Sequence, residues 1–196
     1  MEAIQTYPTG TIKWYDCAGD ASPPEPTPGV ALEDLGRLAL IEPRLSGNDA
    51  NGLLEFQPTS GWPVGQLDLR DEASAFGGAA YGTMSALWAD LTGRRGIGRA
   101  KASKILHLKQ PAFVPILDRF VRNLYDETAR SFSDDGKTPL FWAAIRRDLI
   151  ASTSALAELR AHLDEADPHE RRVRALTDLR LFDIVMWSVA KREALG

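Results

Sequence analysis

The stretch Leu91-Thr-Gly-Arg-Arg-Gly-Ile-Gly-Arg-Ala-Lys-Ala-Ser-Lys-Ile-Leu-His107 joins two short apolar segments, residues 85–91 and 100–108, through a glycine-rich turn. Glycines let the chain adopt positive φ angles and let its backbone approach a partner closely. The backbone amides that follow the turn are the unpaired donors of a new helix N-terminus, which is a favourable place for a phosphate. The stretch therefore predicts a hairpin of two helices over residues 85–108 whose turn can bind a phosphate, although an ordinary turn between two core helices gives a similar pattern.

The same segment is basic, whereas the rest of the chain is acidic. The net charge of the chain is −4, but residues 92–125 contribute +7 and the remainder −11. Asp118 is the only acid of this window. A basic patch on an acidic protein is the electrostatic signature of a site for a polyanion, although surface charges also cluster by chance. The basic residues of the window are Arg94, Arg95, Arg99, Lys101, Lys104, Lys109, Arg119 and Arg122.

Length and composition limit the class of protein. A chain of 196 residues with 44% hydrophobic residues forms one domain, or one domain with a small accessory half. It contains no run of about 18 consecutive apolar residues and no secretory pattern at its N-terminus, so we expect neither a membrane span nor secretion. The single Cys17 fits a reducing cytoplasm, and the dispersed histidines give no zinc pattern. We therefore expect a cytoplasmic protein without a metal.

Helical spacing predicts an all-α fold. No run of β-branched residues alternates over four or more positions, so the sequence predicts no strand. Four prolines between residues 23 and 28 exclude regular structure, and we expect residues 1–29 to be an irregular, Pro-rich N-terminal arm. Residues 30–196 are expected to form a single helical domain that contains the hairpin.

Individual helix boundaries follow from capping and proline signals. Ser46 is the predicted N-cap of a short helix, and Asp118 is placed to cap the helix that follows Pro115. Asp167-Pro168-His169-Glu170 combines an N-cap, a proline at the first helical position and an acid at the third, as in a capping box. The helices expected on this basis span 30–41 (ended by Pro43), 46–54, a short stretch near 69–76, 99 to before Pro111, 119 to about 129, 138–150 with Thr138-Pro139 at its start, 154–166, and a last helix whose apolar stripe is Leu179, Phe182, Val185, Met186 and Val189.

Gly96-Ile-Gly-Arg-Ala-Lys-Ala resembles the hairpin of the helix-hairpin-helix DNA glycosylase superfamily, whose members grip DNA with a Leu-Pro-Gly-Val-Gly-Arg-Lys-Thr-Ala segment. Asp118 in Pro115-Ile-Leu-Asp118 follows Gly96 by 22 residues, a separation that matches the one between the hairpin and the catalytic aspartate of that superfamily. The resemblance covers about residues 85–125. The wider chain, with Trp14-Tyr15 and the segment Leu181-Phe-Asp-Ile-Val-Met-Trp187, is similar to an uncharacterised bacterial family known only as a domain of unknown function, which implies no activity.

The resemblance implies a glycosylase-like helical fold and a DNA partner. Asp118 would lie beside the sugar of a flipped nucleotide, stabilise the positive charge that builds up as the N-glycosidic bond breaks, and orient or deprotonate the attacking water. A purely capping role for Asp118 is the alternative, and the two roles are compatible. The hairpin would hold a phosphate, with or without a monovalent cation and with no other cofactor. The residues expected to contact DNA are Arg94, Arg95, Gly96, Ile97, Gly98, Arg99, Lys101, Lys104, Arg119 and Arg122.

Departures from the superfamily pattern narrow the implied reaction. Members with lyase activity have a lysine directly after the hairpin arginine, where this chain has Ala100; Lys101 is one place later and rotated by about 100° on a helix. The resemblance therefore implies a monofunctional enzyme that leaves an abasic site. Phe120 and Asn123 replace a histidine and an arginine of the pattern, Arg94-Arg95 replaces Leu-Pro, and the cysteine cluster of the iron–sulfur branch is absent. These changes leave open that the fold survives without the activity.

A pocket for the flipped base is the least defined part of the expected site. In the resembled superfamily, polar residues at the end of an early helix enter the gap left by that base, and the corresponding region here is roughly residues 42–49. Glu42 or Asp49 would accept a hydrogen bond from a base amino group, with Asn48 beside them, although a capped surface turn is the alternative. Trp14 and Tyr15 would stack on a base, or else anchor the arm in the core.

Three functions are consistent with these features. The first is a monofunctional DNA glycosylase that excises a damaged or modified base, for example from modified viral DNA as a defence. The second is a non-catalytic helix-hairpin-helix protein that binds DNA without sequence preference. The third is an interaction protein whose glycines only permit tight helix packing. We expect a monomer.

Overall fold

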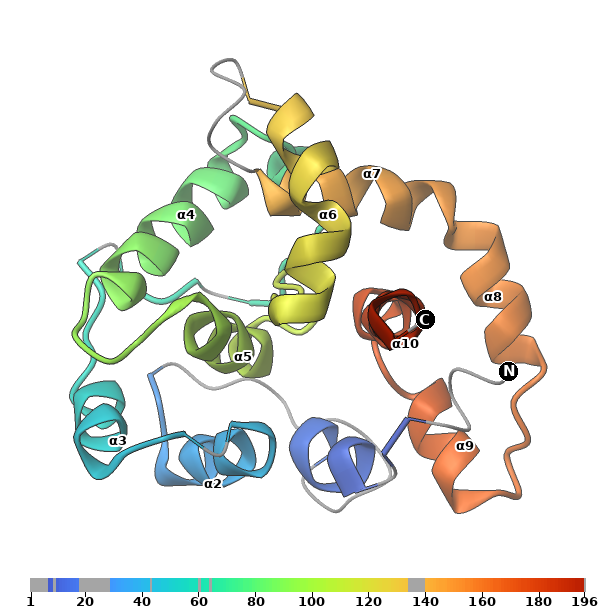
Figure 1. Cartoon of the computed structure of the whole chain (residues 1–196), viewed down its shortest axis with the longest axis horizontal. Helices are drawn as coiled ribbons and strands as arrows, with labels where there is room; N and C mark the ends of the chain where they lie inside the picture. Colours follow the sequence, from blue (N-terminus) through green and yellow to red (C-terminus); the bar gives the residue numbers. More distant parts are fainter. Residues whose placement is uncertain are drawn as a thin grey trace.

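The computed structural model describes residues 7–8, 10–17, 29–42, 44–59, 61–63, 65–133 and 140–195. These residues form helices joined by loops, with no strand among them, so the expected all-α class is confirmed (Figure 1). Helices α5 and α10 lie near the centre of the view in Figure 1, and the other helices surround them. The elements in chain order are η1 (Thr11–Asp16), α2 (Leu32–Ile41), α3 (Gly47–Leu54), η2 (Glu72–Ser74), α4 (Ala79–Thr92), α5 (Arg99–Lys109), α6 (Arg119–Ser131), α7 (Phe141–Ala151), α8 (Thr153–Ala161), α9 (Pro168–Arg174) and α10 (Asp178–Leu195).

Helix α5 is buried along most of its length. Every residue from Ala102 to Lys109 is shielded from solvent, and α5 packs against both α4 and α2. Ile105 and Leu106 are fully buried in the core, together with Phe113 from the loop that follows. Because a buried polar group is costly without a partner, the polar side chains of α5 need partners inside the protein.

Two capping predictions that concern the site are confirmed. Ser46 caps α3: its Oγ accepts the Asp49 amide at 3.2 Å, and the Asp49 carboxylate accepts the Ser46 amide at 3.0 Å. Asp118 caps α6, because its Oδ1 accepts the Val121 amide at 2.9 Å. Both carboxylates are thereby fixed at a helix N-terminus, where backbone amides lack helical partners.

A third cap is confirmed only in part. Asp167 accepts the amides of His169 and Glu170 at 2.6 and 3.1 Å, and Pro168 begins α9 as predicted. The Glu170 carboxylate, however, accepts the amide of Asp164 at 2.7 Å. Glu170 therefore stabilises the loop that precedes α9, and the expected capping box is wrong in its second half.

The N-terminal segment contains a helical turn that the sequence did not indicate. Element η1 is a π-helix in which Ile12 and Tyr15 are fully buried. It packs against α2 and α9, and this packing stabilises a turn too short to be stable alone. The expectation that residues 1–29 are irregular is therefore wrong for residues 11–16. The prolines between residues 23 and 28 lie outside the described residues.

Other helix boundaries differ from the expected ones by several residues. Helix α4 begins at Ala79 rather than near residue 85, and α8 ends at Ala161 rather than at residue 166. Only η2 is helical within the short helix expected near residues 69–76. Pro43 and Thr138-Pro139, which were expected to end one helix and begin another, lie outside the described residues.

Helix α10 has a broader buried face than its apolar stripe predicted. Leu179 and Phe182 are buried as expected, but the other stripe residues are only half-buried. Arg180 and Asp183 are buried as well. Because α10 packs against α6, α7 and α8, it is enclosed on more than one side, and polar residues outside the stripe also enter the interior.

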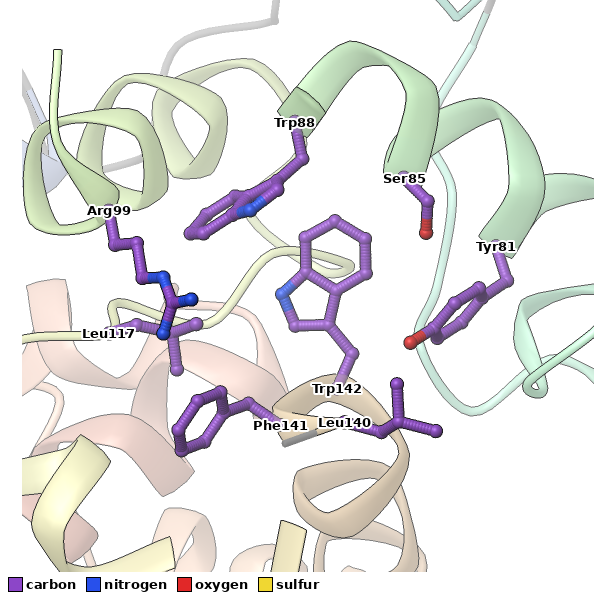
Figure 2. A pocket seen from close by; sticks show the side chains of 8 residues that line it. All are labelled: Tyr81, Ser85, Trp88, Arg99, Leu117, Leu140, Phe141 and Trp142. Atoms are coloured by element: carbon purple, nitrogen blue, oxygen red, sulfur yellow. The ribbon is translucent and has the colours of Figure 1, made fainter. Parts of the chain in front are cut away.

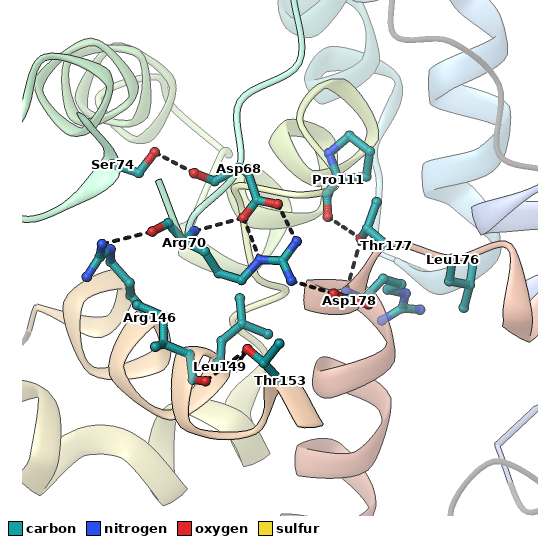
Figure 3. Close-up of polar contacts among 12 residues, drawn as sticks. Asp68, Arg70, Ser74, Pro111, Arg146, Leu149, Thr153, Leu176, Thr177 and Asp178 are labelled. Atoms are coloured by element: carbon teal, nitrogen blue, oxygen red, sulfur yellow. Dashed lines mark hydrogen bonds and ion pairs between the residues drawn. The ribbon is translucent and has the colours of Figure 1, made fainter. Parts of the chain in front are cut away.

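A polar network attaches the loop before α4 to the start of α10 (Figure 3). Arg70 forms ion pairs with Asp68 and with Asp178, and Arg160 of α8 reaches the second oxygen of Asp178 at 2.7 Å. The Thr177 hydroxyl donates to the carbonyl of Pro111 at 2.8 Å. These contacts fix the start of α10 relative to the loop after α5, and so position the charged residues of α10.

Candidate nucleic-acid site

The hairpin turn between α4 and α5 has the expected backbone. Gly96 has a φ of 86°, which a residue with a side chain rarely adopts. The Ile97 amide donates to the Arg94 carbonyl at 3.1 Å, and the Ile97 side chain is buried, so the turn is anchored to the core. Gly98 is the N-cap of α5 and provides no side-chain hydrogen bond, which leaves the first-turn amides of α5 open to a ligand such as phosphate.

Asp49 packs against this turn from the N-terminus of α3. A Cβ atom on Gly96 would lie 2.1 Å from Asp49 Oδ1, so the contact requires glycine. Lys101 Nζ donates to Asp49 Oδ2 at 2.7 Å and to the Gly96 carbonyl at 3.1 Å. Hydrogen bonds from Lys101 and from Ser46 lower the pKa of Asp49 to about 2. The structure thus gives Asp49 and Lys101 the role of clamping the hairpin, and their expected contacts with a base and a phosphate stay predictions.

The lysines of α5 all form ion pairs with acids from residues 34–49. Lys104 Nζ lies 3.0 Å from Glu42 Oε2 and donates to the Ile41 carbonyl at 2.9 Å. Burial opposes the charge of Glu42, but the hydrogen bond and charge of Lys104 outweigh burial and lower its pKa. The structure therefore gives Lys104 and Glu42 a structural role, and their expected contacts with a phosphate and a base stay predictions. The pairs are Lys101–Asp49, Lys104–Glu42 and Lys109–Asp34.

The arginines of the basic segment, in contrast, form no ion pair with a carboxylate in the part of the chain that the structure describes, although the charges of Arg99 and Arg122 help Arg130 to lower the pKa of Asp126. Arg95 and Arg99 are exposed and form no hydrogen bond there. Arg94 donates to the Gly52 carbonyl at 3.2 Å and lies over the ring of Phe56, but meets no acid. A guanidinium binds phosphate oxygens in a bidentate manner, so these side chains suit a polyanion. This arginine surface consists of Arg94, Arg95, Arg99, Arg119 and Arg122.

Asp118 lines a pocket of about 190 Å³ between α5, α6, α10 and the N-terminal segment, which we call the carboxylate pocket. Two aromatic residues from distant parts of the chain, Tyr7 and Trp187, lie edge to face on its wall with 5.3 Å between ring centroids. The pocket thus combines stacking surfaces with charge. Its charged residues are Asp118, Asp183, Lys104 and Arg180.

Two buried charged residues of α10 contribute to the carboxylate pocket. Arg180 donates to both oxygens of Asp16, at 2.8 and 3.1 Å, and to the Tyr7 hydroxyl at 2.9 Å. Asp183 Oδ2 accepts the Ile116 amide at 2.8 Å. Burial raises the pKa of Asp183 to about 7, although the charge of Arg180 lowers it in part. The second carboxyl group of the pocket therefore holds a proton up to near-neutral pH.

The aromatic and amide residues expected to contact a base lie elsewhere. Tyr15 is fully buried, and its hydroxyl donates to the Lys104 carbonyl at 2.7 Å, so it is a core residue that cannot stack on a base. Trp14 is 49% exposed, and Asn48 is exposed on α3. None of these three residues lines the carboxylate pocket. The structure therefore does not bring them together with Asp118.

Sequence reasoning missed Tyr7, Arg180, Asp183 and Trp187. A signal existed for two of them, because Arg180 and Asp183 interrupt an apolar helical segment, and a buried charge requires a partner or a function. No signal marked Tyr7, which reaches the pocket through its hydrogen bond to a residue 173 positions away. Trp187 was noted in the sequence only as part of a family likeness.

Two further observations concern the chemistry of the interior. Within the described ranges, no group of three or more His, Cys, Asp or Glu side chains is arranged to hold a metal ion. Burial lowers the pKa of His107 to about 3, so its ring is neutral, and Nδ1 donates to the Val114 carbonyl at 2.7 Å. No helix in the described part of the chain is long and apolar enough to cross a membrane.

The chain is thus an all-helical protein with a glycine hairpin, an arginine surface and a pocket that contains two carboxyl groups. A family model described as a family of unknown function, DUF6308, matches residues 63–190, and the chain belongs to this family. The expected likeness to an uncharacterised family is therefore confirmed. No curated protein and no solved structure matches the chain. Residues that precede the family match, among them Tyr7 and Thr11, contribute to the carboxylate pocket.

Proposed function

We propose that this protein is a monofunctional DNA glycosylase that flips a damaged or modified base out of DNA and hydrolyses its N-glycosidic bond. The observation that supports this most is the position of Asp118, which caps α6 and lines a pocket together with a second carboxyl group, that of Asp183. The arginine surface and the uncapped start of α5 provide contacts for the phosphate backbone. A glycosylase needs both a grip on the backbone and a carboxylate beside a pocket for an extruded nucleotide.

The proposed reaction uses the two carboxyl groups differently. The bond between C1′ of the sugar and the base nitrogen breaks, and a water oxygen forms the new bond to C1′. Asp118 stabilises the positive charge that develops on the sugar and accepts the proton of the attacking water. Asp183, which is protonated near neutral pH, donates a proton to the departing base. The net change is the hydrolysis of one bond by one water molecule.

The aromatic residues of the carboxylate pocket suit an extruded base. Tyr7 and Trp187 lie on the same wall as the charged groups, and base–aromatic stacking contributes about 1–3 kcal/mol per base. Arg180 is fixed by Asp16, so the donors on this side of the pocket are held in place. In this proposal, Tyr7 and Trp187 replace Trp14 and Tyr15 as the stacking residues.

The lysines near the site support a monofunctional reaction. Lys101 is paired with Asp49 and Lys104 with Glu42, and a protonated amine in an ion pair is a poor nucleophile for C1′. Ala100 stands where the resembled lyases have their lysine. The product is therefore an abasic site in an unbroken strand.

The proposal is tested by incubating the protein with duplexes that contain ordinary, deaminated, alkylated or glucosylated bases, followed by hot alkali. We expect strand breaks only after alkali. Asp118→Asn is expected to lower the excision rate by about 100-fold or more. Asp126→Asn is the matched control, because Asp126 lies on the same helix, pairs with Arg130 and does not line the carboxylate pocket.

The other outcomes distinguish the alternatives. Breaks before alkali would contradict a monofunctional mechanism. Intact strands on every substrate, with DNA binding retained, would favour a non-catalytic DNA-binding protein, and no DNA binding at low salt would favour an interaction protein. Excision restricted to glucosylated bases would support a role in defence against modified viral DNA.

A further inference from the structure

A second pocket, of about 230 Å³, lies between α4, α5 and α7 (Figure 2). Trp142 packs edge to face against Tyr81 and against Trp88, with 5.6 Å between ring centroids in each pair. Leu117 lines this pocket, whereas the next residue, Asp118, lines the carboxylate pocket. The two pockets therefore adjoin the same short segment of chain. We call the second pocket the aromatic pocket, and the residues used below are Tyr81, Ser85, Trp88, Arg99, Phe141 and Trp142.

Several polar groups of the aromatic pocket have no partner among the described residues. These are the hydroxyls of Tyr81 and Ser85 and the indole N–H groups of Trp88 and Trp142. Tyr81 and Trp142 are nevertheless more than nine-tenths buried, with 9% and 6% of their surface exposed. Figure 2 shows the oxygens of Tyr81 and Ser85 directed toward the space beside the Trp142 ring. None of these four polar atoms is itself fully buried, so each is open to a partner from the pocket side. A few polar groups placed among apolar and aromatic side chains are what orients a ligand in a pocket.

The chemistry of these groups limits the ligand. Indole N–H groups only donate, hydroxyls donate or accept, and aromatic faces and edges favour contact with another planar ring. The complementary ligand is therefore a planar heterocycle with hydrogen-bond acceptors on its edge. Nucleobases have this combination, and they stack on aromatic side chains.

Arg99 adds a positive charge at this pocket. It is the first residue of α5, it is exposed, and it forms no ion pair with a described residue. In Figure 2 its guanidinium is turned toward the pocket, beside Trp88 and Phe141. The uncapped amides of the first turn of α5 follow directly along the chain. An arginine and a helix N-terminus next to an aromatic pocket suit a phosphate that is joined to a planar ring.

We propose that the aromatic pocket is a second nucleotide site, in which a nucleobase stacks on Trp88, the more exposed of the two indoles, and its phosphate contacts Arg99. The ligand chemistry is a base linked to a phosphate. Its source is an unpaired nucleotide of a DNA strand or a free nucleoside monophosphate. The site does not require the reaction at Asp118, and it extends the protein's contact with nucleic acid beyond the proposed excision.

The test uses 2-aminopurine, a fluorescent base whose emission falls when it stacks on an aromatic ring. The probes are its deoxynucleoside monophosphate and a single-stranded oligonucleotide with one internal 2-aminopurine. We expect saturable quenching that is weakened about tenfold by Arg99→Gln and by Ser85→Trp, which fills the pocket from α4. Tyr81→Phe removes only the unpaired hydroxyl and is expected to weaken binding about threefold. Trp14→Leu, which removes an exposed tryptophan outside the pocket, is the matched control.

Quenching of the monophosphate would identify a free nucleotide as the ligand, and quenching of the oligonucleotide alone would identify a DNA strand. Absence of quenching with both probes would overturn the proposal, as would equal competition by deoxyribose 5-phosphate, because the base would then contribute nothing. Unchanged binding by Ser85→Trp and Tyr81→Phe would also overturn it. Probe binding is measured by quenching and base excision by strand breaks after alkali, so failure of this site and failure of excision are separate results.

Discussion

Two groups of cations within one basic segment have opposite roles. Each lysine of α5 forms an ion pair with a carboxylate from residues 34–49, whereas the arginine surface forms no ion pair in the described part of the chain and only its Arg99 and Arg122 interact, at longer range, with Asp126. Both groups contribute to the charge of +7 over residues 92–125, yet only the arginines remain available to a polyanion. The net charge of this segment therefore overestimates the positive charge that is free to attract a polyanion, because acids from residues 34–49 neutralise its three lysines. Arginine, with its planar fork of donors, is also the better phosphate ligand of the two.

Breaking a buried ion pair on the lysine side is expected to have the largest effect. Lys104→Ala leaves the buried Glu42 carboxylate with only Arg44 as a cation, at 3.7 Å, and we expect a cost of about 3 kcal/mol of unfolding free energy. Urea unfolding of the wild type and the variant measures the difference. The double variant Lys104→Met with Glu42→Leu removes both charges and should recover most of the stability. A double variant as unstable as the single one would contradict the explanation by charge.

Asp183 differs from the paired carboxylates Asp34, Glu42 and Asp49, because it is a buried carboxyl group for which the described residues provide no ion pair. Its pKa is raised from 3.8 to about 7 by burial, so between these pH values the unfolded chain loses a proton that the folded protein keeps. The contribution of Asp183 to the unfolding free energy is therefore expected to fall as pH rises from about 4 to about 7, by at most about 4 kcal/mol. Buried His107, whose pKa is lowered to about 3, contributes in the opposite direction below about pH 6.5, so the effect of Asp183 is measured as a difference between the wild type and a variant.

The variant Asp183→Asn tests this pH dependence. Asparagine keeps an oxygen for the Ile116 amide but has no proton to lose, so the wild-type curve should fall relative to the variant curve as pH rises from about 4 to about 7. Urea unfolding at a series of pH values gives both curves, and parallel curves would contradict the raised pKa. If Asp183 is also the acid of the proposed reaction, wild-type excision should decline above about pH 7.

The hairpin turn lies between the lysines of α5 and the arginine surface. The ion pair of Lys101 with Asp49 clamps the turn that precedes Arg99. Gly96→Ala would strain a residue at φ 86° and press a methyl group against Asp49, at an expected cost of about 2 kcal/mol. Gly98→Ala is the matched control, since Gly98 has a negative φ and a methyl group there would have no neighbouring atom within 4 Å, and it should cost less than about 1 kcal/mol. Thermal unfolding compares them, and equal losses would argue against the clamp.

The smallest effect on stability is expected on the arginine side. Arg95→Gln removes an exposed side chain without a partner in the described ranges, so the unfolding free energy should change by no more than about 0.5 kcal/mol. DNA affinity should nevertheless fall for all sequences, and the salt dependence of binding should lose about one counterion. Titration of a labelled duplex at several salt concentrations measures both. Arg44→Gln, at an exposed arginine outside this surface, should leave them unchanged.

Local features of the site were predictable from the sequence. The caps at Ser46 and Asp118 depend on residues three positions away, and the positive φ at Gly96 depends on the turn itself. The likeness to a family of unknown function was predicted as well. The interpretation as a glycosylase hairpin stays a prediction.

Long-range pairing was not predictable. Lys104 meets Glu42 across 62 positions, and Arg180 meets Asp16 across 164 positions. Spacing along a single helix contains no information on either contact, so the sequence assigned Lys104 to DNA and Glu42 to a base. The place of Tyr7 at the carboxylate pocket was missed for the same reason.

The carboxylate pocket is formed by residues from opposite ends of the described chain. Tyr7 and Thr11 meet Arg180 and Trp187 there, whereas the clamp of the hairpin needs only residues 49–101. Asp118 and Asp183 share a pocket only when α10 has docked, so this pocket depends on the folding of the whole described chain, whereas the ion pair of the clamp is local.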